Sequence, residues 1–345
     1  MHQQVRCHGI AHRQVREFSG KHREARSSAR NLRSTSGKEF PLQRTAAAWH
    51  LRAMLTGLDH FVVAVRDLAV ATRTYSRLLG RTATWRGEHP VLGTENTLFR
   101  LANTYLELLA PTPGAGRWLS ERLEANGEGP FALAFATDDA EAFRAQAEAR
   151  GLRPSAVQPG LGRDSDSGAF RKWRNVLLDR AATHGAQLFA IEHLSPPELL
   201  PLSPPTDENA DATMNSVDHV VVQTQDGERA KALYGDALGI RLALDRSFPQ
   251  WGSRLLFFRL GHLTVEVAAA LEGAAKPGVP DRFWGVSYRV ADAIAAHARL
   301  REAGFDATPV KPGRKPGTFV FTVNGETHGV ATLVLQPSIS ERRPG

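Results

Sequence analysis

The sequence predicts an α+β fold in which four β-α-β-β-β units pair into two tandem domains with curved mixed sheets around a cleft. The motif LDHFVVAVR at 58–66 returns as VDHVVVQTQ at 217–225. Further residue types repeat at the same offset of 159 residues, and a constant offset of this kind indicates an internal duplication. The matching pairs are His60 and His219, Tyr75 and Tyr234, Gly80 and Gly239, Arg100 and Arg259, and Glu107 and Glu266.

The first unit begins with a β-branched run at 58–65, which is typical of a strand. Apolar residues at helical spacing then predict a helix from Asp67, a plausible N-cap, to Leu79. Gly80 is a natural helix stop. The unit is completed by three expected strands, near 82–86, 96–101 and 104–109.

A second unit is a weaker copy of the first. It offers a strand at 131–139, a helix at 140–150 and a charged loop at 160–168. Strands near 169–177 and 187–193 follow. The third unit repeats the first at the 159-residue offset, and a fourth, more divergent unit covers 283–337 with a helix at about 292–303.

Five prolines and four acidic residues between Ser195 and Thr213 indicate an extended linker between the domains. The expected division is therefore a basic N-terminal extension, a first domain, a proline-rich linker, a second domain and a tail. Their bounds are 1–53, 54–195, 196–214, 215–338 and 339–345.

The net charge of +7 comes from the N-terminal extension. Residues 1–53 hold 11 basic and 3 acidic side chains, a net of +8, so the remainder carries −1. We expect no nucleic-acid surface on the folded body. The extension has three interpretations: a disordered tail, a transit peptide, or residues upstream of a natural start at Met54. We favour the start at Met54 or plain disorder.

No apolar stretch is long enough for a transmembrane helix, so we expect no membrane partner. The only cysteine, Cys7, lies in the extension. A body without cysteine fits a reducing cytoplasm.

Three carboxylates lie inside apolar strands: Glu107, Glu192 and Glu266. A buried unpaired charge costs several kcal/mol, so each needs a cation, a metal or a proton. One interpretation is a cross-strand ion pair, because an arginine precedes Glu107 and Glu266 by seven residues in each case. The other pairs His60 with Glu107, and His219 with Glu266, at an identical spacing of 47 residues, as metal ligands.

The LDHFVVAV-helix-glycine start, the strand-borne glutamates and the four units resemble the vicinal oxygen chelate superfamily. This group includes glyoxalase I, extradiol dioxygenases, fosfomycin-resistance proteins and methylmalonyl-CoA epimerase. GTENTLFRLANTYLELLAP, KWRNVL and LFAIEH are most similar to its glyoxalase-like branch. The resemblance covers about 55–337.

The resemblance implies a divalent metal (Zn, Ni, Mn or Fe) held by the first and last strands of paired units. In the first domain these positions carry His60, Glu107 and Glu192, with Ala132 where a histidine is usual. The second domain offers only His219 and Glu266, because Gly285 and Leu333 take the other two positions. If the first and third units paired instead, the four histidine and glutamate ligands would converge. We expect neighbouring units to pair.

We therefore expect a metal-dependent, glyoxalase-like isomerase or lyase acting on a small oxygenated substrate. Glu192 or Glu107 would take a proton beside a metal-bound carbonyl. Arg174, Trp173 and Arg100 are the expected substrate-binding residues, and His193 is expected to point away from the site. Two alternatives stay open: a metal-free binding or resistance protein, and an extradiol-type dioxygenase. A homodimer is a further open expectation.

Overall fold

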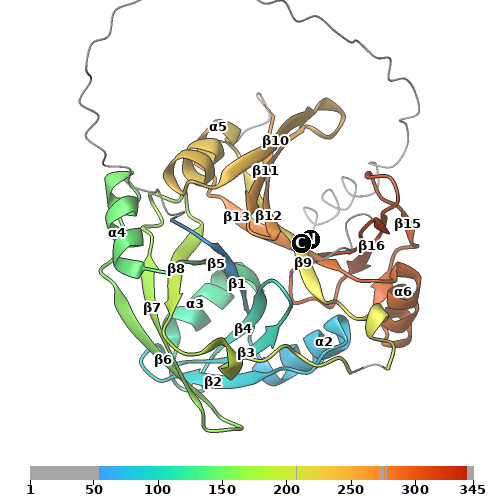
Figure 1. The fold of residues 1–345 in the computed structure, drawn as a ribbon, viewed down its shortest axis with the longest axis horizontal. Coiled ribbons are helices and arrows are strands. Elements are labelled where there is room, and N and C mark those ends of the chain that lie inside the picture. Colours follow the sequence, from blue (N-terminus) through green and yellow to red (C-terminus); the bar gives the residue numbers. More distant parts are fainter. Residues whose placement is uncertain (1–53, 207, 272–275, 277, 340–345) are drawn as a thin grey trace, which may run out of the picture. The chain divides into compact units, whose positions relative to one another are not determined.

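The computed structural model describes residues 54–206, 208–271, 276 and 278–339 (Figure 1). The predictions made for 1–53 and for most of the tail lie outside these residues. No helix in the described ranges has the length and apolar character needed to cross a membrane.

The first unit has the predicted element order. Asp67 accepts a hydrogen bond from the backbone N–H of Val70 and caps the helix, which ends at Gly80 in the left-handed conformation (φ 68°). The strands are displaced by a few residues from their expected places. The elements are β1 (Gly57–Ala64), α2 (Leu68–Leu79), β2 (Trp85–His89), β3 (Thr94–Arg100) and β4 (Tyr105–Pro111).

The second unit differs from the expectation at 160–168, which was predicted as a loop. Residues 158–164 form a strand there, and a further helix, α3, precedes the unit. The elements are α3 (Arg117–Asn126), β5 (Gly129–Ala136), α4 (Ala140–Ala149), β6 (Gln158–Asp164), β7 (Phe170–Leu177) and β8 (Gln187–His193).

These two units close into one barrel with the strand order β1-β4-β3-β2-β6-β7-β8-β5. Antiparallel pairing of β1 with β5 joins the units on one side, and His60 lies opposite Ala134 there. On the other side β2 pairs with β6, so the curved sheet expected from the sequence closes into a barrel in this domain.

The linker contains two short 3₁₀ turns, Pro197–Leu199 and Ala210–Ala212. The second domain then forms an open sheet with the order β10-β11-β12-β9-β13-β17-β16-β14, and β15 pairs with β16. The third-unit helix changes from α5 into a π-helical turn at Lys231–Ala237. The other elements are β9 (Ser216–Thr224), α5 (Gly227–Ala230), β10 (Arg241–Phe248), β11 (Ser253–Leu260), β12 (Leu263–Ala270), β13 (Arg282–Arg289), α6 (Ala293–Glu302), β14 (Asp306–Ala307), β15 (Lys311–Pro312), β16 (Phe319–Asn324) and β17 (Ala331–Gln336).

Antiparallel pairing of β9 with β13 joins the third and fourth units. Neighbouring units therefore pair in both domains. The alternative pairing of the first unit with the third is wrong, and the two histidine–glutamate pairs lie in separate sheets.

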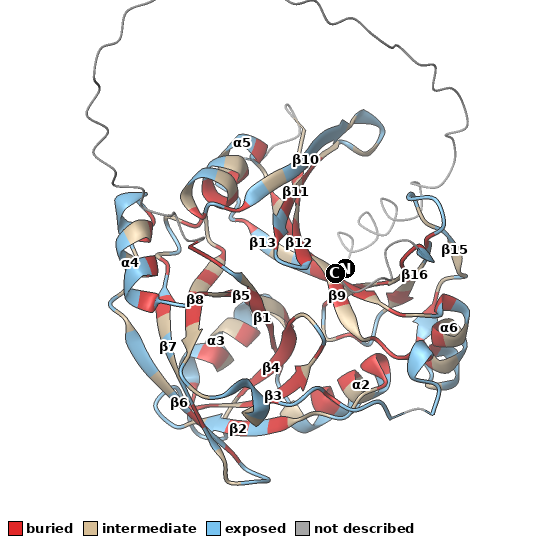
Figure 2. Ribbon diagram, viewed as in Figure 1, coloured by how far each residue is buried: buried red, intermediate tan, exposed pale blue. Residues whose placement is uncertain are grey.

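The two faces of β1 have different neighbours, as the period of two in a strand requires. Phe61 and Val63 pack outward with α2, whereas Val62 and Ala64 face the barrel interior. Leu119 and Leu123 of α3 pack against this inner face. Helices were expected only on the outer side of the sheet, but α3 packs against the inner side. Strands β1 and β4 are almost wholly buried (Figure 2).

Candidate functional site

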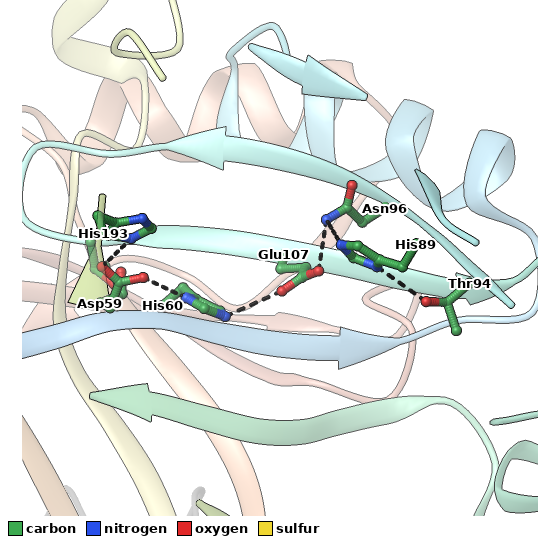
Figure 3. Close-up of polar contacts among 8 residues, drawn as sticks. Asp59, His60, His89, Thr94, Asn96, Glu107 and His193 are labelled. Atoms are coloured by element: carbon green, nitrogen blue, oxygen red, sulfur yellow. Dashed lines mark hydrogen bonds and ion pairs between the residues drawn. The ribbon is translucent and has the colours of Figure 1, made fainter. Parts of the chain in front are cut away.

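The inner face of the first barrel carries a chain of polar contacts that starts at β1 (Figure 3). The Nδ1–H of His60 donates to Oδ1 of Asp59 over 2.7 Å. On the other side of the ring, Nε2 lies 3.2 Å from Oε2 of Glu107 on β4. His60 is 3% exposed and Glu107 is 9% exposed, so a buried imidazole is held between two buried carboxylates.

The contacts between His60, Asp59 and Glu107 determine the charge of each of these side chains. Burial disfavours the imidazolium, but the hydrogen bonds and charges of Asp59 and Glu107 outweigh it and raise the pKa of His60 to about 9. Burial also opposes ionisation of Asp59, and hydrogen bonds from His193 and His60 reverse this and lower its pKa. The pKa of Glu107 is lowered in the same way, chiefly by His60. At neutral pH the three groups are one imidazolium and two carboxylates.

The chain continues beyond Glu107. Asn96 of β3 donates from Nδ2 to Oε1 of Glu107 over 2.8 Å, and the same nitrogen lies 3.4 Å from Nε2 of His89. Nδ1 of His89 contacts Oγ1 of Thr94 at 3.1 Å. Burial lowers the pKa of His89, so its ring is neutral and Nε2 accepts.

At the opposite end, His193 of β8 contacts Asp59, with 3.0 Å between Nε2 and Oδ2. The carboxylate of Asp59 therefore bridges two imidazole rings. Oγ1 of Thr104 donates to the backbone carbonyl of Asp59 and fixes the start of β1.

Aromatic rings enclose the chain. The ring of Tyr105 stacks on His60 at 4.5 Å, and Phe189 meets it edge-on at 5.5 Å. The indole of Trp173 lies against Gly160, where a Cβ would come within 2.1 Å of its Nε1. Gly160 therefore makes room for this ring, which meets the imidazole of His89 edge-on at 6.2 Å between centroids.

The structure does not bring Glu192 to His60. Glu192 lies on the outer face of β8, where its carboxylate accepts from the backbone N–H of Ala140 at the start of α4 and lies 3.5 Å from Arg174. The predicted face of β8 is wrong: His193, which was expected to point away, is the residue on the inner face. A shift of one residue reverses the side of a strand on which a side chain lies.

The prediction that Arg174 binds substrate at this site is wrong for the same reason. Its position opposite Glu192 places it on the outer face, whereas Trp173 pairs with His193 and faces inward. Arg100 also lies on the inner side, with its guanidinium 5.9 Å from the ring of Tyr105. Glu107 is paired with His60 and Asn96, so the alternative of an Arg100–Glu107 ion pair is not what the structure shows.

The helix caps Asp67 and Asp139 relate the first unit to the second by an offset of 72 residues. Val62, which lies opposite Glu107, then corresponds to Ala134, and Ala134 lies opposite Phe189. Phe189 is thus the counterpart of Glu107, a position that the sequence interpretation gave to Glu192.

The inner face therefore supplies two donors from the first unit, His60 and Glu107, while the second unit supplies Ala132 and Phe189, which cannot bind a metal. Within the described residues no group of three or more His, Cys, Asp or Glu side chains is arranged to hold a metal ion. Structural and catalytic zinc sites in proteins use at least three protein ligands. The residues of this site do not make up the set of metal ligands that the resemblance implied.

The second domain contains a looser copy of the histidine pair. Nδ1 of His219 lies 2.8 Å from Asp218, and Nε2 lies 3.5 Å from Glu266. Burial lowers the pKa of His219, but Asp218 and Glu266 outweigh it and raise the value. A Cβ on Gly285 would lie 2.3 Å from the carbonyl oxygen of Ala331, so this strand has no room for the missing histidine.

Sequence reasoning missed Asp59, His89, Asn96 and His193 as parts of the site. Asp59 could have been found, because an Asp-His pair begins both motifs and recurs as Asp218 and His219. Alternation from Glu107 through the β3–β4 hairpin could have suggested Asn96. His89 and His193 lie on strands whose register depends on barrel closure, and no local pattern marks them.

Comparison with known proteins agrees with the fold. A glyoxalase-like domain family matches residues 58–214, and the glyoxalase/bleomycin resistance protein/dioxygenase superfamily matches residues 218–321. No curated protein matches the chain.

Solved structures similar to this chain include a mutant of 4-hydroxymandelate synthase from Streptomyces coelicolor, with 14% identity, a TM-score of 0.60 and coverage of 82% of this chain and 92% of that one. The Mn(II)-bound glyoxalase from Novosphingobium aromaticivorans has 13% identity and a TM-score of 0.54, covering 82% of both chains. At such identities the likeness concerns the fold alone. Together, the two family matches and the four-unit architecture place this chain in the vicinal oxygen chelate superfamily, as a protein with two tandem glyoxalase-like domains.

Proposed function

We propose that the first domain is a glyoxalase-like enzyme that moves a proton at a small oxygenated substrate, in an isomerase or lyase reaction. The observation that supports this most is His60, a buried imidazole bracketed by Asp59 and Glu107. General acid–base catalysis needs an acid and a base within hydrogen-bond reach, with pKa values set by burial and neighbouring charge.

The roles follow from the geometry. Asp59 holds Nδ1–H, so Nε2–H of His60, which contacts Glu107 in the free protein, is the end left to donate to a substrate oxygen once Glu107 takes up a proton. Glu107, on the other side of the 3.2 Å contact, is the base that removes a proton from the neighbouring carbon. When the C–H bond breaks, the electron pair forms an enolate, and His60 stabilises or protonates its oxygen. Return of the proton to another carbon completes an isomerisation.

The sequence also implied a metal-dependent form of this activity. A metal-dependent activity needs metal ligands in addition to His60 and Glu107, because the side chains of Ala132 and Phe189 cannot bind a metal. Every role assigned above belongs to a side chain of this protein. A second candidate, binding of a small aromatic compound without reaction, is favoured by the rings of Tyr105 and Phe189 around His60. We also infer a cytoplasmic setting, supported by a body without cysteine.

Proton abstraction is tested directly by solvent exchange. The full-length protein is incubated in D₂O with 2-hydroxyketones, 2-oxoacids and thioesters that carry an acidic α-hydrogen, and loss of the C–H signal is followed by NMR. We expect exchange with at least one class, a fall of 10²-fold or more in the H60Q and E107Q variants, and no change with chelator. The matched control is E192Q, a carboxylate on the outer face.

Exchange that is equal in wild type, H60Q and E107Q would contradict the assigned roles. Exchange that chelator abolishes and added divalent metal restores would favour the metal-dependent form. Thermal stabilisation by an aromatic ligand in the presence of chelator, with no exchange in any class, would favour the binding protein.

A further inference from the structure

Helix α3 covers the inner face of the first barrel beside the histidine–glutamate pair. Leu119 and Leu123 of this helix pack against inner-face residues of β1, β4 and β5. Phe189, which meets the ring of His60 edge-on, packs against the same cluster. His60 is 3% exposed and Glu107 is 9% exposed, so a substrate reaches them only when an element around this face moves.

Among the elements around this face, α3 is attached more weakly than the strands. Each strand of the closed barrel is hydrogen-bonded to a neighbour on both sides. Helix α3 buries only two of its ten residues, and no side chain caps its N-terminus. The twelve-residue α2, by comparison, buries five residues and has an aspartate cap. Because packing supplies most of the stability of a helix in a protein, α3 leaves the barrel at a lower cost in free energy than a strand does.

Glycine residues flank α3 on both sides. Gly114 precedes the helix and Gly127 ends it, each with a φ of 75°. Nothing lies within 4 Å of a Cβ at either position, so neighbouring atoms do not restrict the backbone there. Hinges in proteins are a few residues at the ends of elements that absorb a backbone rotation. Rotation at these two glycines moves α3 as a unit.

The C-terminal hinge is held by a side chain from the second domain. His328, in the loop between β16 and β17, contacts Glu128, with 2.9 Å between Nδ1 and Oε2. The other oxygen of Glu128 accepts from the backbone N–H of Arg66 over 2.7 Å. Nη2 of Arg66 also donates to the carbonyl oxygen of Leu123 in the last turn of α3. The contacts that begin at His328 therefore end on α3.

The loop that carries His328 is itself fixed against the first domain. Oη of Tyr75 donates to the carbonyl oxygen of Thr327 over 3.2 Å, and the ring of Tyr75 stacks on that of His328 at 6.1 Å. A Cβ on Gly329 would lie 2.4 Å from the carbonyl oxygen of Glu128. The loop therefore reaches the hinge this closely only because residue 329 is glycine.

We propose that α3 is a lid over the site of the first domain, and that the second domain holds the lid closed through the contact between His328 and Glu128. The helix rotates about Gly114 and Gly127 and uncovers the inner face, while the strands of the barrel keep their pairing. The second domain thereby controls access to the first. The part of this motion in catalysis rests on the function proposed above, whereas the motion itself does not.

The opening of the lid is measured by thiol modification of the full-length protein. Cys7, the only cysteine, is replaced by serine, and a single cysteine is introduced by V62C or V63C. Val62 packs on the inner face under α3, Val63 packs on the outer face with α2, and both are almost fully buried. Iodoacetamide should modify V62C at least about tenfold faster than V63C, because local opening costs less than global unfolding. Equal rates would overturn the lid.

The hold of the second domain is tested by adding H328Q to each cysteine variant. The modification rate of V62C should rise about tenfold and that of V63C should not change, because a hydrogen bond to a charged group is lost only at the hinge. An unchanged rate for V62C, or an equal rise for both cysteine variants, would overturn the assignment to His328.

H184Q is the matched control for H328Q. His184 has the corresponding place in the loop Thr183-His184-Gly185 of the first domain, and the two histidines share a positive φ, 57° and 50°. The contact of His184 with the second domain is made by its backbone carbonyl, which accepts from the N–H of Asp281 over 2.8 Å. H184Q should therefore leave the modification rate of V62C unchanged.

Hydrogen exchange followed by mass spectrometry gives a readout on the wild-type protein. The amides of α3 should exchange at least about tenfold faster than those of α4, a helix of the same length with an aspartate cap. Equal protection of the two helices would contradict the lid. Neither measurement uses a substrate, so both outcomes are independent of whether the protein exchanges substrate protons in D₂O.

Discussion

The imidazole of His193 contacts the carboxylate of Asp59 over 3.0 Å, although 134 residues of chain separate them. The other oxygen of Asp59 accepts from His60. One carboxylate thus orients two histidines, of which the sequence marked only His60. Because a carboxylate bonded through both oxygens cannot rotate freely, Asp59 holds the ring on which the proposed proton transfer depends.

Replacement of Asp59 by asparagine should lower the pKa of His60 below its value of about 9, because the ring loses a charged acceptor. NMR titration of the ring C–H signals measures this pKa. Breaking a buried ion pair should also reduce the free energy of unfolding by about 3 kcal/mol. The matched control is D218N, which alters the same motif in the second domain and should leave His60 unchanged. An unshifted titration of His60 in D59N would show that Asp59 does not set its charge.

The pKa of His60 also predicts how stability depends on pH. The folded value of about 9 lies above the ordinary value of 6.5, so the contribution of His60 is complete below pH 6.5 and is lost as the pH rises through 9. The pKa values of Asp59 and Glu107 are lowered, so their contributions are lost as the pH falls below the ordinary carboxyl range.

Denaturant unfolding at pH 6, 8 and 10 should therefore show a decline of up to about 3 kcal/mol attributable to His60. H60Q should lose most of this decline. A decline of equal size in H60Q would mean that other groups cause it.

Phe189 is the counterpart of Glu107 in the second unit, so a carboxylate there should create metal affinity together with His60 and Glu107. F189E should be destabilised by roughly 3 kcal/mol without metal, since a charge replaces a packed ring. Co²⁺ should restore much of the lost melting temperature by adding His60, Glu107 and the new carboxylate to its coordination. F189Q is the matched control, because its amide is a weaker ligand. Equal stabilisation of both variants by Co²⁺ would refute the correspondence between Phe189 and Glu107.

Gly160 lies where the barrel has no room for a side chain beside Trp173. An alanine there would place its Cβ against the indole of Trp173, and overpacking of this kind costs about 1–3 kcal/mol. The free energy of unfolding and the Nε1–H resonance of Trp173 should both change in G160A. G57A is the control, since nothing lies within 4 Å of a Cβ at Gly57. If both variants unfold alike, the indole is not confined by Gly160.

Glu192 should act on stability and not on the site. Its carboxylate accepts from the N–H of Ala140, the first residue of α4, so E192Q should cost about 0.5–1 kcal/mol. The pKa of His60 should stay at its wild-type value in the same variant. A shifted His60 titration would return Glu192 to the site from which the structure excludes it.

The amino-acid sequence determined the architecture of this protein. The 159-residue offset, the helix caps and the alternation around His60 are local signals, and they predicted four units in two domains. The 47-residue spacing made His60 one of two candidate partners for Glu107, the other being Arg100, and the parallel pairing of β1 with β4 brings His60 to it.

Only the tertiary structure decided what completes the site. Glu192 and His193 are adjacent, and a register shift of one residue exchanges their faces, so no pattern within β8 could choose between them. The choice follows from the pairing of β8 with β5 and β7. Closure of the barrel through β2 and β6 is likewise a long-range pairing, and it brings His89 into the interior. The sequence gives the chemical type of each side chain, but the face of the sheet on which a side chain lies depends on hydrogen bonds between strands that are far apart in the chain.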